Sequence, residues 1–392
     1  MIPISSSTSS LSPAARPTTI CVIGAGVVGL SIAWLLQRQG HAVTLVDPAL
    51  AGPAPEGSGS AAALGLLMAQ VYRRRSGRGW RLRQQSLALW QAWRVELEHR
   101  GRPIPWRSGL LQLAASQQEL ESQQRLVMER QAMGLPLRLL SRAELESLQP
   151  VPPAAALGGL FSPNDGQIDP LPAMAALRAD ARASGLQEYP VATQALEGHP
   201  GGGPDGRWRL QLADGRHLHC RWLVLSAGLA SPALLAPLGH ARPQRPVLGQ
   251  ALELELPAGC ADAGGWPGSL SWDGLNLVPR PGRRLWLGAT LEPGQGLVDG
   301  RPGPEAAAAL QRLRTLNGQA PPWLLEATVL RQWQGLRARP EGRPAPLLEA
   351  LEPGLLLASG HYRNGVLLAP ASAAWVAAVI ADDDAGEGRQ PP

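Results

Sequence analysis

The sequence predicts an α/β fold in which a Rossmann-like domain with a parallel sheet is joined to a domain built on an antiparallel sheet. Three observations lead to this prediction. Residues 18–23 form a β-branched run that passes through a glycine-rich turn into an apolar helix and a second strand. A second apolar run, at 222–225, ends in small residues, and residues 245–291 are mostly strand-like. The first two patterns are typical of parallel strands that meet a ligand at their carboxyl ends.

The individual elements follow from hydrophobic periodicity and from turn residues. The expected strands are 18–23, 42–46, 208–212, 217–226, 248–256, 276–279, 285–289 and 355–359. The expected helices are 30–39, 83–100, 116–133, 171–184, 305–316 and one that starts near Leu368. Residues 52–65, rich in Gly, Ser and Ala, are expected to form a loop that enters a small-residue helix, and residues 144–163 are turn-rich.

Composition narrows the chemistry. The 392 residues are enough for one large domain or two joined domains, and a hydrophobic fraction of 44% is typical of a globular chain. All 36 basic residues are arginine, so the chain has no lysine. A Schiff-base amine is therefore excluded, which removes pyridoxal enzymes and lysine-dependent aldolases. The phosphate-binding Walker loop, which needs a lysine, is excluded as well.

The arginines are dispersed except for one run that could form a nucleic-acid patch. This run consists of Arg73, Arg74, Arg75, Arg78, Arg81 and Arg83. It lacks the interleaved aromatic residues on which bases would stack. We therefore expect a solvated helix entrance and no nucleic-acid partner.

Metal binding, secretion and membrane insertion are not indicated. The three cysteines lie far apart, and no histidine pair has further ligands at metal-binding spacing, so no metal site is expected. The Ser/Thr/Pro-rich residues 1–17 carry one charge, which favours a disordered tail over a secretory signal. The most apolar stretch, 365–381, contains Pro370 and Ser372 and is expected to be a buried helix, in a cytoplasmic protein without stable membrane insertion.

The glycine-rich turn predicts a dinucleotide site. Gly24 permits the tight turn, Gly26 lets the backbone approach a pyrophosphate, and Gly29 lets the helix pack closely on the strand. The N–H groups at the start of the helix, at Val27 and Val28, face the phosphates together with the positive end of the helix dipole. Asp47 ends the second strand, where a carboxylate accepts hydrogen bonds from ribose hydroxyls. The turn alone does not distinguish NAD from FAD.

Two later segments carry further candidate residues. The strand 222–225 runs into Ser226, Ala227 and Gly228, whose small size permits a ligand to approach closely. A polar loop at 360–365 joins an apolar strand to an apolar helix, which is a common position for a site. Upstream of it, Arg337 ends an apolar run.

With these segments the chain resembles the D-amino-acid oxidase (DAO) family of FAD-dependent oxidoreductases, and within it the glycine oxidases of thiamine biosynthesis. The resemblance extends from Thr18 to Ile380. Its landmarks are GAGVVG at 24–29, SAAALGLL at 60–67, DGQIDP at 165–170, SAG at 226–228, PVLGQ at 246–250, VPR at 278–280, GAT at 288–290, GLR at 335–337 and GHYRNGVLLAP at 360–370.

The resemblance implies which residues hold the cofactor and the substrate. Arg337 would clamp a substrate carboxylate, and Arg363 would lie beside the flavin and the substrate. Asn276 stands where glycine oxidases carry a tyrosine, and its amide would donate a hydrogen bond to the same carboxylate. His361 would be a hydrogen-bonding loop residue and not a general base. Besides the turn and Asp47, the FAD contacts would be Ser60, Gly65, Ala227, Gly228, Gly360, Arg363, Asn364, Gly365, Val366 and Leu367. FAD would bind non-covalently, because no cysteine lies near 337–348.

The resemblance also implies an activity and a domain organisation. The expected reaction is oxidative deamination of a small amino acid by hydride transfer to FAD, with oxygen reduced to hydrogen peroxide. Two alternatives stay open, a D-amino-acid dehydrogenase that passes electrons to a quinone and a non-catalytic FAD-binding module; a homo-oligomer is also left open. The FAD-binding domain is expected at 18–90, 150–235 and 330–381, the substrate domain at 91–149 and 236–329, and tails at 1–17 and 382–392.

Overall fold

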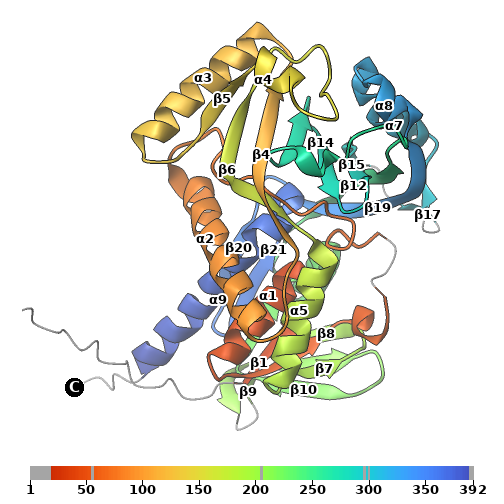
Figure 1. Cartoon of the computed structure of the whole chain (residues 1–392). Coiled ribbons are helices and arrows are strands. Elements are labelled where there is room, and N and C mark those ends of the chain that lie inside the picture. Colours follow the sequence, from red (N-terminus) through yellow and green to blue (C-terminus); the bar gives the residue numbers. More distant parts are fainter. Residues whose placement is uncertain (1–18, 54–56, 204–205, 295–296, 299–300, 388–392) are drawn as a thin grey trace, which may run out of the picture.

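The computed structural model describes residues 19–53, 57–203, 206–294, 297–298 and 301–387. In this part of the chain two large sheets lie one above the other, with the parallel one at the bottom of the view in Figure 1. The parallel sheet contains strands from the beginning, the middle and the end of the chain. The chain therefore leaves this sheet to build the second one and then returns to it.

The parallel sheet has six strands in the order β20-β21-β11-β1-β2-β7. Strand β1 lies near the centre and pairs in parallel with β2 and with β11, and only β20 runs antiparallel to its neighbour. The carboxyl ends of β1, β2, β11 and β21 therefore meet at one edge. The strand bounds are Thr19–Ile23 for β1, Ala42–Val46 for β2, Gln187–Tyr189 for β7, Trp222–Leu225 for β11, Leu347–Glu352 for β20 and Leu355–Ser359 for β21.

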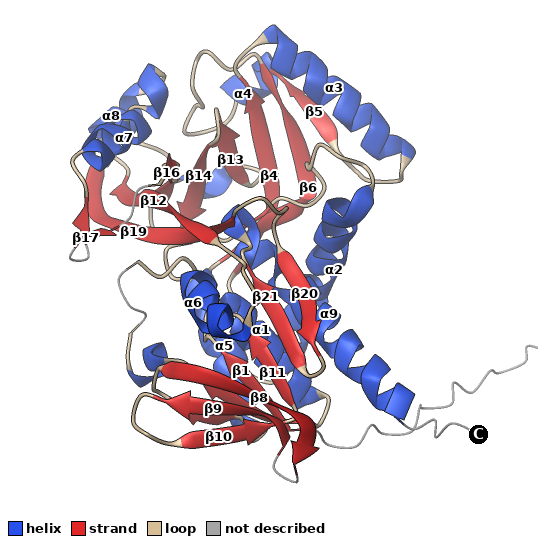
Figure 2. Cartoon of the chain, turned by 180° about the vertical axis from the view of Figure 1, so that it is seen from behind, coloured by secondary structure: helices blue, strands red, loops and turns tan. Residues whose placement is uncertain are grey.

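Alternate residues of these strands enter two different cores. Ile20 and Val22 pack with helices on one face, whereas Cys21 and Ile23 pack on the other face against a three-stranded antiparallel sheet, seen at the bottom of Figure 2. The helices are α1 (Val27–Arg38), α2 (Gly77–His99), α5 (Pro170–Ala183) and α9 (Gly365–Glu387). The small sheet consists of β8 (Thr193–Gly203), β9 (Gly206–Leu212) and β10 (His217–Cys220).

The second sheet contains ten strands and is mostly antiparallel, with β13 and β4 as a parallel pair. The main path runs β16-β12-β15-β14-β13-β4-β6-β3, with β19 paired to β12 and β5 paired to β6. The bounds are Leu66–Leu67 for β3, Trp106–Ala114 for β4, Arg138–Ser141 for β5, Gly158–Ile168 for β6, Gln244–Glu255 for β12, Ser269–Trp272 for β13, Leu275–Arg280 for β14, Arg284–Gly288 for β15, Glu292–Pro293 for β16 and Thr328–Pro340 for β19.

Helices and one small hairpin complete the outer part of the layer that contains the ten-stranded sheet (Figure 1). The helices are α3 (Gln117–Ala132), α4 (Arg142–Glu146), α7 (Glu305–Arg314) and α8 (Pro322–Glu326). The hairpin pairs β17 (Leu297–Val298) with β18 (Arg301–Pro302). A further short helix, α6 (Ser231–Leu235), follows β11.

The predicted α/β fold class, with one parallel and one largely antiparallel sheet, is confirmed. Three local predictions are wrong. The loop predicted at 52–65 leads into strand β3 and not into a small-residue helix, residues 158–163 belong to the long strand β6, and the last helix begins at Gly365 and not near Leu368. Several strands were not anticipated, among them β4, β8 and β19, whose sequences mix polar, glycine and proline residues that weaken the alternating pattern.

The predicted domain boundaries stay a prediction. Strands β6 and β19 fall inside the ranges assigned to the FAD-binding domain but pair within the ten-stranded sheet. Helix α9 continues into the range assigned to the C-terminal tail, while residues 1–17 lie outside the described residues.

One described helix is long and apolar enough to cross a membrane, at Tyr362–Asp383. It crosses the centre of the lower layer, where it packs against α1 and α2, and most of its apolar side chains are buried. It is therefore the buried core helix that the sequence predicts.

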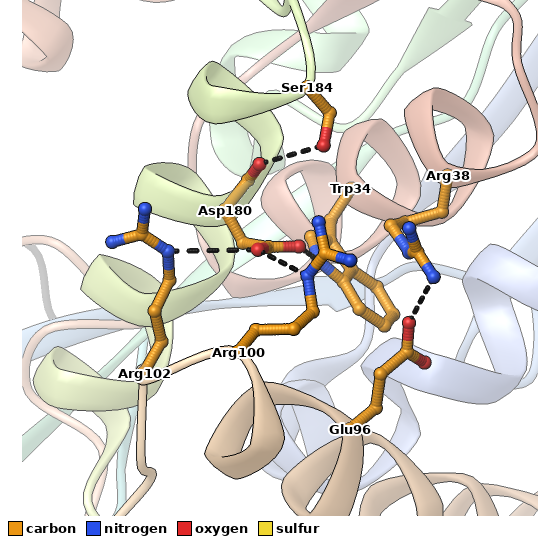
Figure 3. Close-up of polar contacts among 7 residues, drawn as sticks. All are labelled: Trp34, Arg38, Glu96, Arg100, Arg102, Asp180 and Ser184. Carbon is orange, nitrogen blue, oxygen red and sulfur yellow. Dashed lines mark hydrogen bonds and ion pairs between the residues drawn. The ribbon is translucent and has the colours of Figure 1, made fainter.

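A buried carboxylate ties three segments of the lower layer together. Asp180 on α5 is 2% exposed and accepts hydrogen bonds from Trp34 Nε1 on α1 at 2.9 Å and from Arg100 Nε at 2.7 Å. Arg102 Nε lies 3.6 Å from the same carboxylate, and Figure 3 shows both arginines pointing at it from the loop after α2. Asp180 therefore joins α1, α5 and the end of α2 on the helical face of the parallel sheet.

We predict that Asp180→Asn lowers the free energy of unfolding by about 1–3 kcal/mol, because the amide replaces an acceptor oxygen with a donor that faces Arg100. Urea unfolding checks this. Asp214→Asn is the matched control, since Asp214 pairs with Arg216 on the surface and its loss should change stability little. Equal effects of the two substitutions would contradict the role given to Asp180.

Candidate active site

A cavity of about 1240 Å³ opens at the carboxyl edge of the parallel sheet and extends to the ten-stranded sheet. The loops after β1, β2, β11 and β21 line one part of it, and side chains from β4, β14 and β19 line another. A crevice at this edge is where open α/β sheets bind their ligands. The volume is sufficient for a dinucleotide together with a small second ligand.

The glycine-rich turn is constrained by close packing at two of its three glycines. A Cβ atom on Gly24, whose φ is +105°, would lie 2.6 Å from the carbonyl oxygen of Ser226. A Cβ atom on Gly29 would lie 1.8 Å from the carbonyl oxygen of Gly24, which confirms that this glycine is needed for the helix to pack on the strand. Gly26 meets only the Ser60 side chain, at 3.0 Å, and faces the cavity.

The N-terminus of α1 has the features of an anion-binding site. Gly26 is its N-cap residue and supplies no side-chain hydrogen bond, and no acidic residue lies in the first turn. Ser60 Oγ accepts the N–H of Val27 at 3.1 Å and so ties the 57–65 loop to the helix. The remaining N–H groups and the positive end of the helix dipole point toward the cavity, as a pyrophosphate site requires.

Asp47 lies at the end of β2 on the cavity wall. Its two oxygens accept backbone N–H groups, Oδ2 from Ala25 at 2.6 Å and Oδ1 from Ala49 at 2.7 Å. The carboxylate thus fixes the glycine-rich turn, and its remaining lone pairs are free for further donors. The predicted ribose contact remains a prediction.

The small residues after β11 support the turn directly. Ser226 Oγ donates to the carbonyl oxygens of Ile23 and Gly24, at 3.0 and 3.2 Å. Ala227 and Gly228 then line the cavity. Since β11 is the parallel neighbour of β1, the two ligand-facing loops are held side by side by these bonds.

The 360–365 loop brings its polar residues to the same cavity. Gly360 and Tyr362 adopt left-handed backbone conformations, with φ of +64° and +55°, and the chain then enters α9 at Gly365. Trp90 Nε1 donates to the carbonyl oxygen of Val366 at 2.8 Å and so fixes the first turn of α9 from α2. A non-glycine residue in the left-handed region is a strained position that is common at functional sites.

His361 is buried in this loop, where its Nε2 lies 2.8 Å from Ser372 Oγ. Burial, assisted by the positive charge of Arg78, lowers the pKa of His361 to about 3. The imidazole is therefore neutral at physiological pH and acts as a hydrogen-bonding loop residue, in agreement with the sequence prediction.

Arg337 lies on β19, and its guanidinium packs against Gly249 of the neighbouring strand β12. Its Nη1 donates to the carbonyl oxygens of Leu248 and Thr290, both at 3.1 Å, and a Cβ atom on Gly249 would lie 2.2 Å from the guanidinium. Burial and the nearby charge of Arg363 lower the pKa of Arg337 to about 10, so the group stays charged at neutral pH. Its other N–H donors remain available to a carboxylate in the cavity.

A buried polar network supports Arg337 from behind. Thr290, whose carbonyl oxygen Arg337 contacts, donates from Oγ1 to Glu292 Oε1 at 2.6 Å, and Gln250 Nε2 donates to the same atom at 2.9 Å. Glu292 is 8% exposed and does not line the cavity. Its negative charge therefore favours the charged form of Arg337 without competing for the substrate position.

Asn276 lines the cavity from strand β14 of the ten-stranded sheet. Strand register places it beside Ser271 and Gly288, and Ser271 beside Gln112. Its Oδ1 atom is buried and lacks a hydrogen-bond partner among the described residues. An unpaired buried amide oxygen is costly in a folded protein, so a ligand that supplies a donor is expected here.

The structure brings the predicted residues together with one exception. Gly29 packs under the turn and does not line the cavity, whereas all the other predicted cofactor and substrate residues do. Sequence reasoning missed the contacts of Gly249 and Thr290 with Arg337 and did not name Gln112 as a cavity residue. Gly249 and Thr290 lie in the PVLGQ and GAT segments that carry the family resemblance, but their contact with Arg337 depends on strand pairing that the sequence does not display.

FAD fits the residues present. The uncapped start of α1 and the bare Gly26 suit a pyrophosphate, and the start of α9 at Gly365 offers a second set of backbone N–H groups to the same cavity. Fold and cavity together define an α/β protein of the dinucleotide-binding class, with a Rossmann-type parallel sheet and a second, mixed sheet.

Known proteins share this architecture over nearly the whole chain. A family model described as FAD dependent oxidoreductase (DAO) matches residues 19–379. The glycine oxidase of Geobacillus kaustophilus is 29% identical over 367 residues, 92% of each chain. A crystal structure of glycine oxidase from the same organism superposes with a TM-score of 0.78 at 26% identity, covering 93% of this chain and 95% of that one.

A bifunctional ThiO/ThiG protein of Synechocystis is 34% identical over 231 residues, which are 58% of this chain and 32% of that protein. The family model covers nearly the whole chain, and this coverage assigns the chain to the family. This chain belongs to the DAO family of FAD-dependent oxidoreductases.

We predict that acid destabilises the protein partly through His361. Its pKa is about 3 when folded and near 6.5 when unfolded, so the unfolded chain binds the extra proton and stability falls as pH drops through 6.5. The contribution between pH 7 and pH 5 is about 2 kcal/mol. Urea unfolding at the two pH values should show a smaller loss in His361→Gln than in the wild type.

His219→Gln, a change of an exposed histidine on β10, is the control and should keep the wild-type loss. An unchanged pH dependence in His361→Gln would show that His361 is not a buried neutral group.

Proposed function

We propose that this protein is an FAD-dependent oxidase that oxidatively deaminates a small amino acid to its imine, with glycine, sarcosine or a small D-amino acid as substrate. The observation that carries the proposal is the position of Arg337, a charged guanidinium with unused donors in the same cavity as the glycine-rich turn. A guanidinium in such a place binds a carboxylate through two parallel hydrogen bonds. The similarity to glycine oxidases supports an amino acid as the carboxylate.

When bound, FAD supplies the acceptor for a hydride from the amine carbon and passes the electrons to oxygen, which becomes hydrogen peroxide. The chain's own residues position the reactants. We infer that Gly24, Gly26, Val27, Val28, Asp47, Ala227 and Gly228 hold the pyrophosphate and ribose, without a covalent bond. Ser60, Gly65 and Gly360 to Leu367 would hold the remainder, with the N–H groups at the start of α9 favouring negative charge.

Arg337 and Asn276 would fix the amino acid. Arg337 binds the carboxylate, and the Asn276 amide donates to the same group while its unpaired oxygen accepts from the amine. Arg363, which is exposed at the cavity and close enough to lower the pKa of Arg337, adds positive charge beside the reacting centre. His361 is neutral and hydrogen-bonded, so it does not serve as a titrating base.

A role in thiamine biosynthesis is part of this proposal. The similarity to a bifunctional ThiO/ThiG protein covers 58% of the chain. If glycine is the substrate, its imine is a reactive product suited to thiazole synthesis. A cytoplasmic location agrees with such a role.

We predict that the FAD-loaded protein converts glycine or sarcosine with one hydrogen peroxide formed per amine oxidised. Arg337→Ala should raise KM at least about tenfold, since a charge-assisted contact to the carboxylate is lost. Peroxide and product assays under air, compared with reduction of a dye acceptor, check both points. Val329→Ala, an exposed change on the same strand, is the control.

Turnover with a dye but without peroxide would indicate the dehydrogenase instead. An unchanged KM in Arg337→Ala would remove this residue from the site.

A further inference from the structure

The arginine run between β3 and the first turns of α2 has no role in the proposed reaction. Its members are Arg73, Arg74, Arg75, Arg78, Arg81 and Arg83. Over the part of the chain that the structure describes, none of the six forms an ion pair with a carboxylate, whereas many other arginines do. Six uncompensated positive charges within eleven positions create a strong local field that favours anions.

Two buried charges hold the backbone that precedes this run. The Asp165 carboxylate accepts the N–H groups of Ala69, Gln70 and Val71 at 2.8 to 3.1 Å. Burial raises the pKa of Asp165 to about 6, although the three N–H donors oppose this shift. The carboxylate is therefore mainly ionised at neutral pH, as a group that accepts several backbone donors needs to be.

Arg130 on α3 completes this anchoring from the other side. Its guanidinium is fully buried, lies 4.3 Å from the ring centre of Trp80, and donates to the carbonyl oxygens of Gln70, Tyr72 and Arg74. Residues 69–74 are thus fixed through both their N–H and their carbonyl groups. A rigid segment presents its side chains in defined positions, as a binding site requires.

Three arginines of the run line the same cavity as Arg337 and Asn276. They are Arg73, Arg74 and Arg83. Arg83 is the most constrained, because its Nη1 donates to the Gly79 carbonyl oxygen at 3.2 Å and its guanidinium lies 3.9 Å from the ring centre of Tyr72, another cavity residue. Arg78 is close enough to the 360–365 loop to lower the pKa of His361.

The FAD phosphates do not account for these charges. They are expected at the start of α1, beside the carboxyl end of β1, whereas the arginine run follows β3 at the edge of the ten-stranded sheet. In the ten-stranded sheet, β4, which carries the cavity residue Gln112, lies between β14 with Asn276 and the edge strand β3 that precedes the run. Arg73, Arg74 and Arg83 therefore line the cavity from the side of the ten-stranded sheet, to which Asn276 and Arg337 also belong.

We propose that Arg83, with Arg73 and Arg74, forms a second anion subsite, and that the preferred substrate is an amine that carries a second acidic group in addition to the carboxylate held by Arg337. This inference rests on the proposed function, since it assumes an amino-acid site at Arg337. A carboxylate or a phosphonate has the chemistry that a planar guanidinium recognises. Glycine and sarcosine would then occupy only part of the site.

Binding of two small ethers to the FAD-loaded enzyme tests the subsite without turnover. Diglycolate has two carboxylates and methoxyacetate has one, and neither contains an oxidisable amine. Calorimetry of the wild type should give a Kd for diglycolate at least about tenfold below that for methoxyacetate. Arg83→Gln should abolish this preference. Arg81→Gln is the control, because Arg81 is exposed and does not line the cavity, and it should retain the preference.

Equal Kd values for the two ethers in the wild type would overturn the subsite, and this comparison requires no variant. Equal losses in Arg83→Gln and Arg81→Gln would also overturn it, since the effect would then be one of net charge. If glycine is oxidised but diglycolate has no advantage, only this inference fails. If methoxyacetate does not bind and glycine is not oxidised, the proposed function fails and the subsite with it.

Discussion

A pair of glycines in the large sheet determines how the whole cavity is built. Gly249 of β12 and Gly335 of β19 are directly opposite each other in the antiparallel pair. A Cβ atom on Gly335 would lie 2.5 Å from Ala62 Cβ, and one on Gly249 would lie 2.2 Å from the Arg337 guanidinium. The absence of both side chains lets the 57–65 loop rest on one glycine and Arg337 on the other. Because Ser60 of this loop also accepts the N–H of Val27 at the start of α1, the loop links the ten-stranded sheet to the glycine-rich turn.

The charges of the cavity follow from this arrangement and from the absence of lysine. Arg337 is held by two carbonyl oxygens and supported by Glu292, so its guanidinium is both charged and fixed in direction. Arg363 and three arginines of the run, Arg73, Arg74 and Arg83, add further positive charge to the cavity. A cavity with these groups and low-dielectric walls attracts and orients small anions. Flavin chemistry requires this orientation more than it requires an acid or a base from the protein.

Sequence reasoning found the segments that have strong local signals. The glycine-rich turn, the small residues after β11 and the 360–365 loop each contain positions whose backbone or size is dictated by the ligand, so their residues identify them. The same reasoning failed for β4 and β19. Strand β19 is polar or exposed over most of its length, and the apolar run of β4 follows a polar start that contains a glycine, so neither shows a clear alternating pattern. Pairing with β12 and with β6 makes them strands. The role of Gly249 was hidden for the same reason, since it depends on the register of two strands about eighty positions apart in the chain.

Anaerobic reduction of the bound flavin by glycine in Gly249→Ala tests this account most directly. A methyl group at this position would displace the Arg337 guanidinium while leaving its charge in the protein. We predict that the apparent Kd for glycine in stopped-flow reduction rises at least about tenfold, with FAD still bound. Gly259→Ala, at a position with no atom within 4 Å of the added Cβ, should behave as the wild type. Wild-type affinity for glycine in Gly249→Ala would contradict the central role of the Arg337 position.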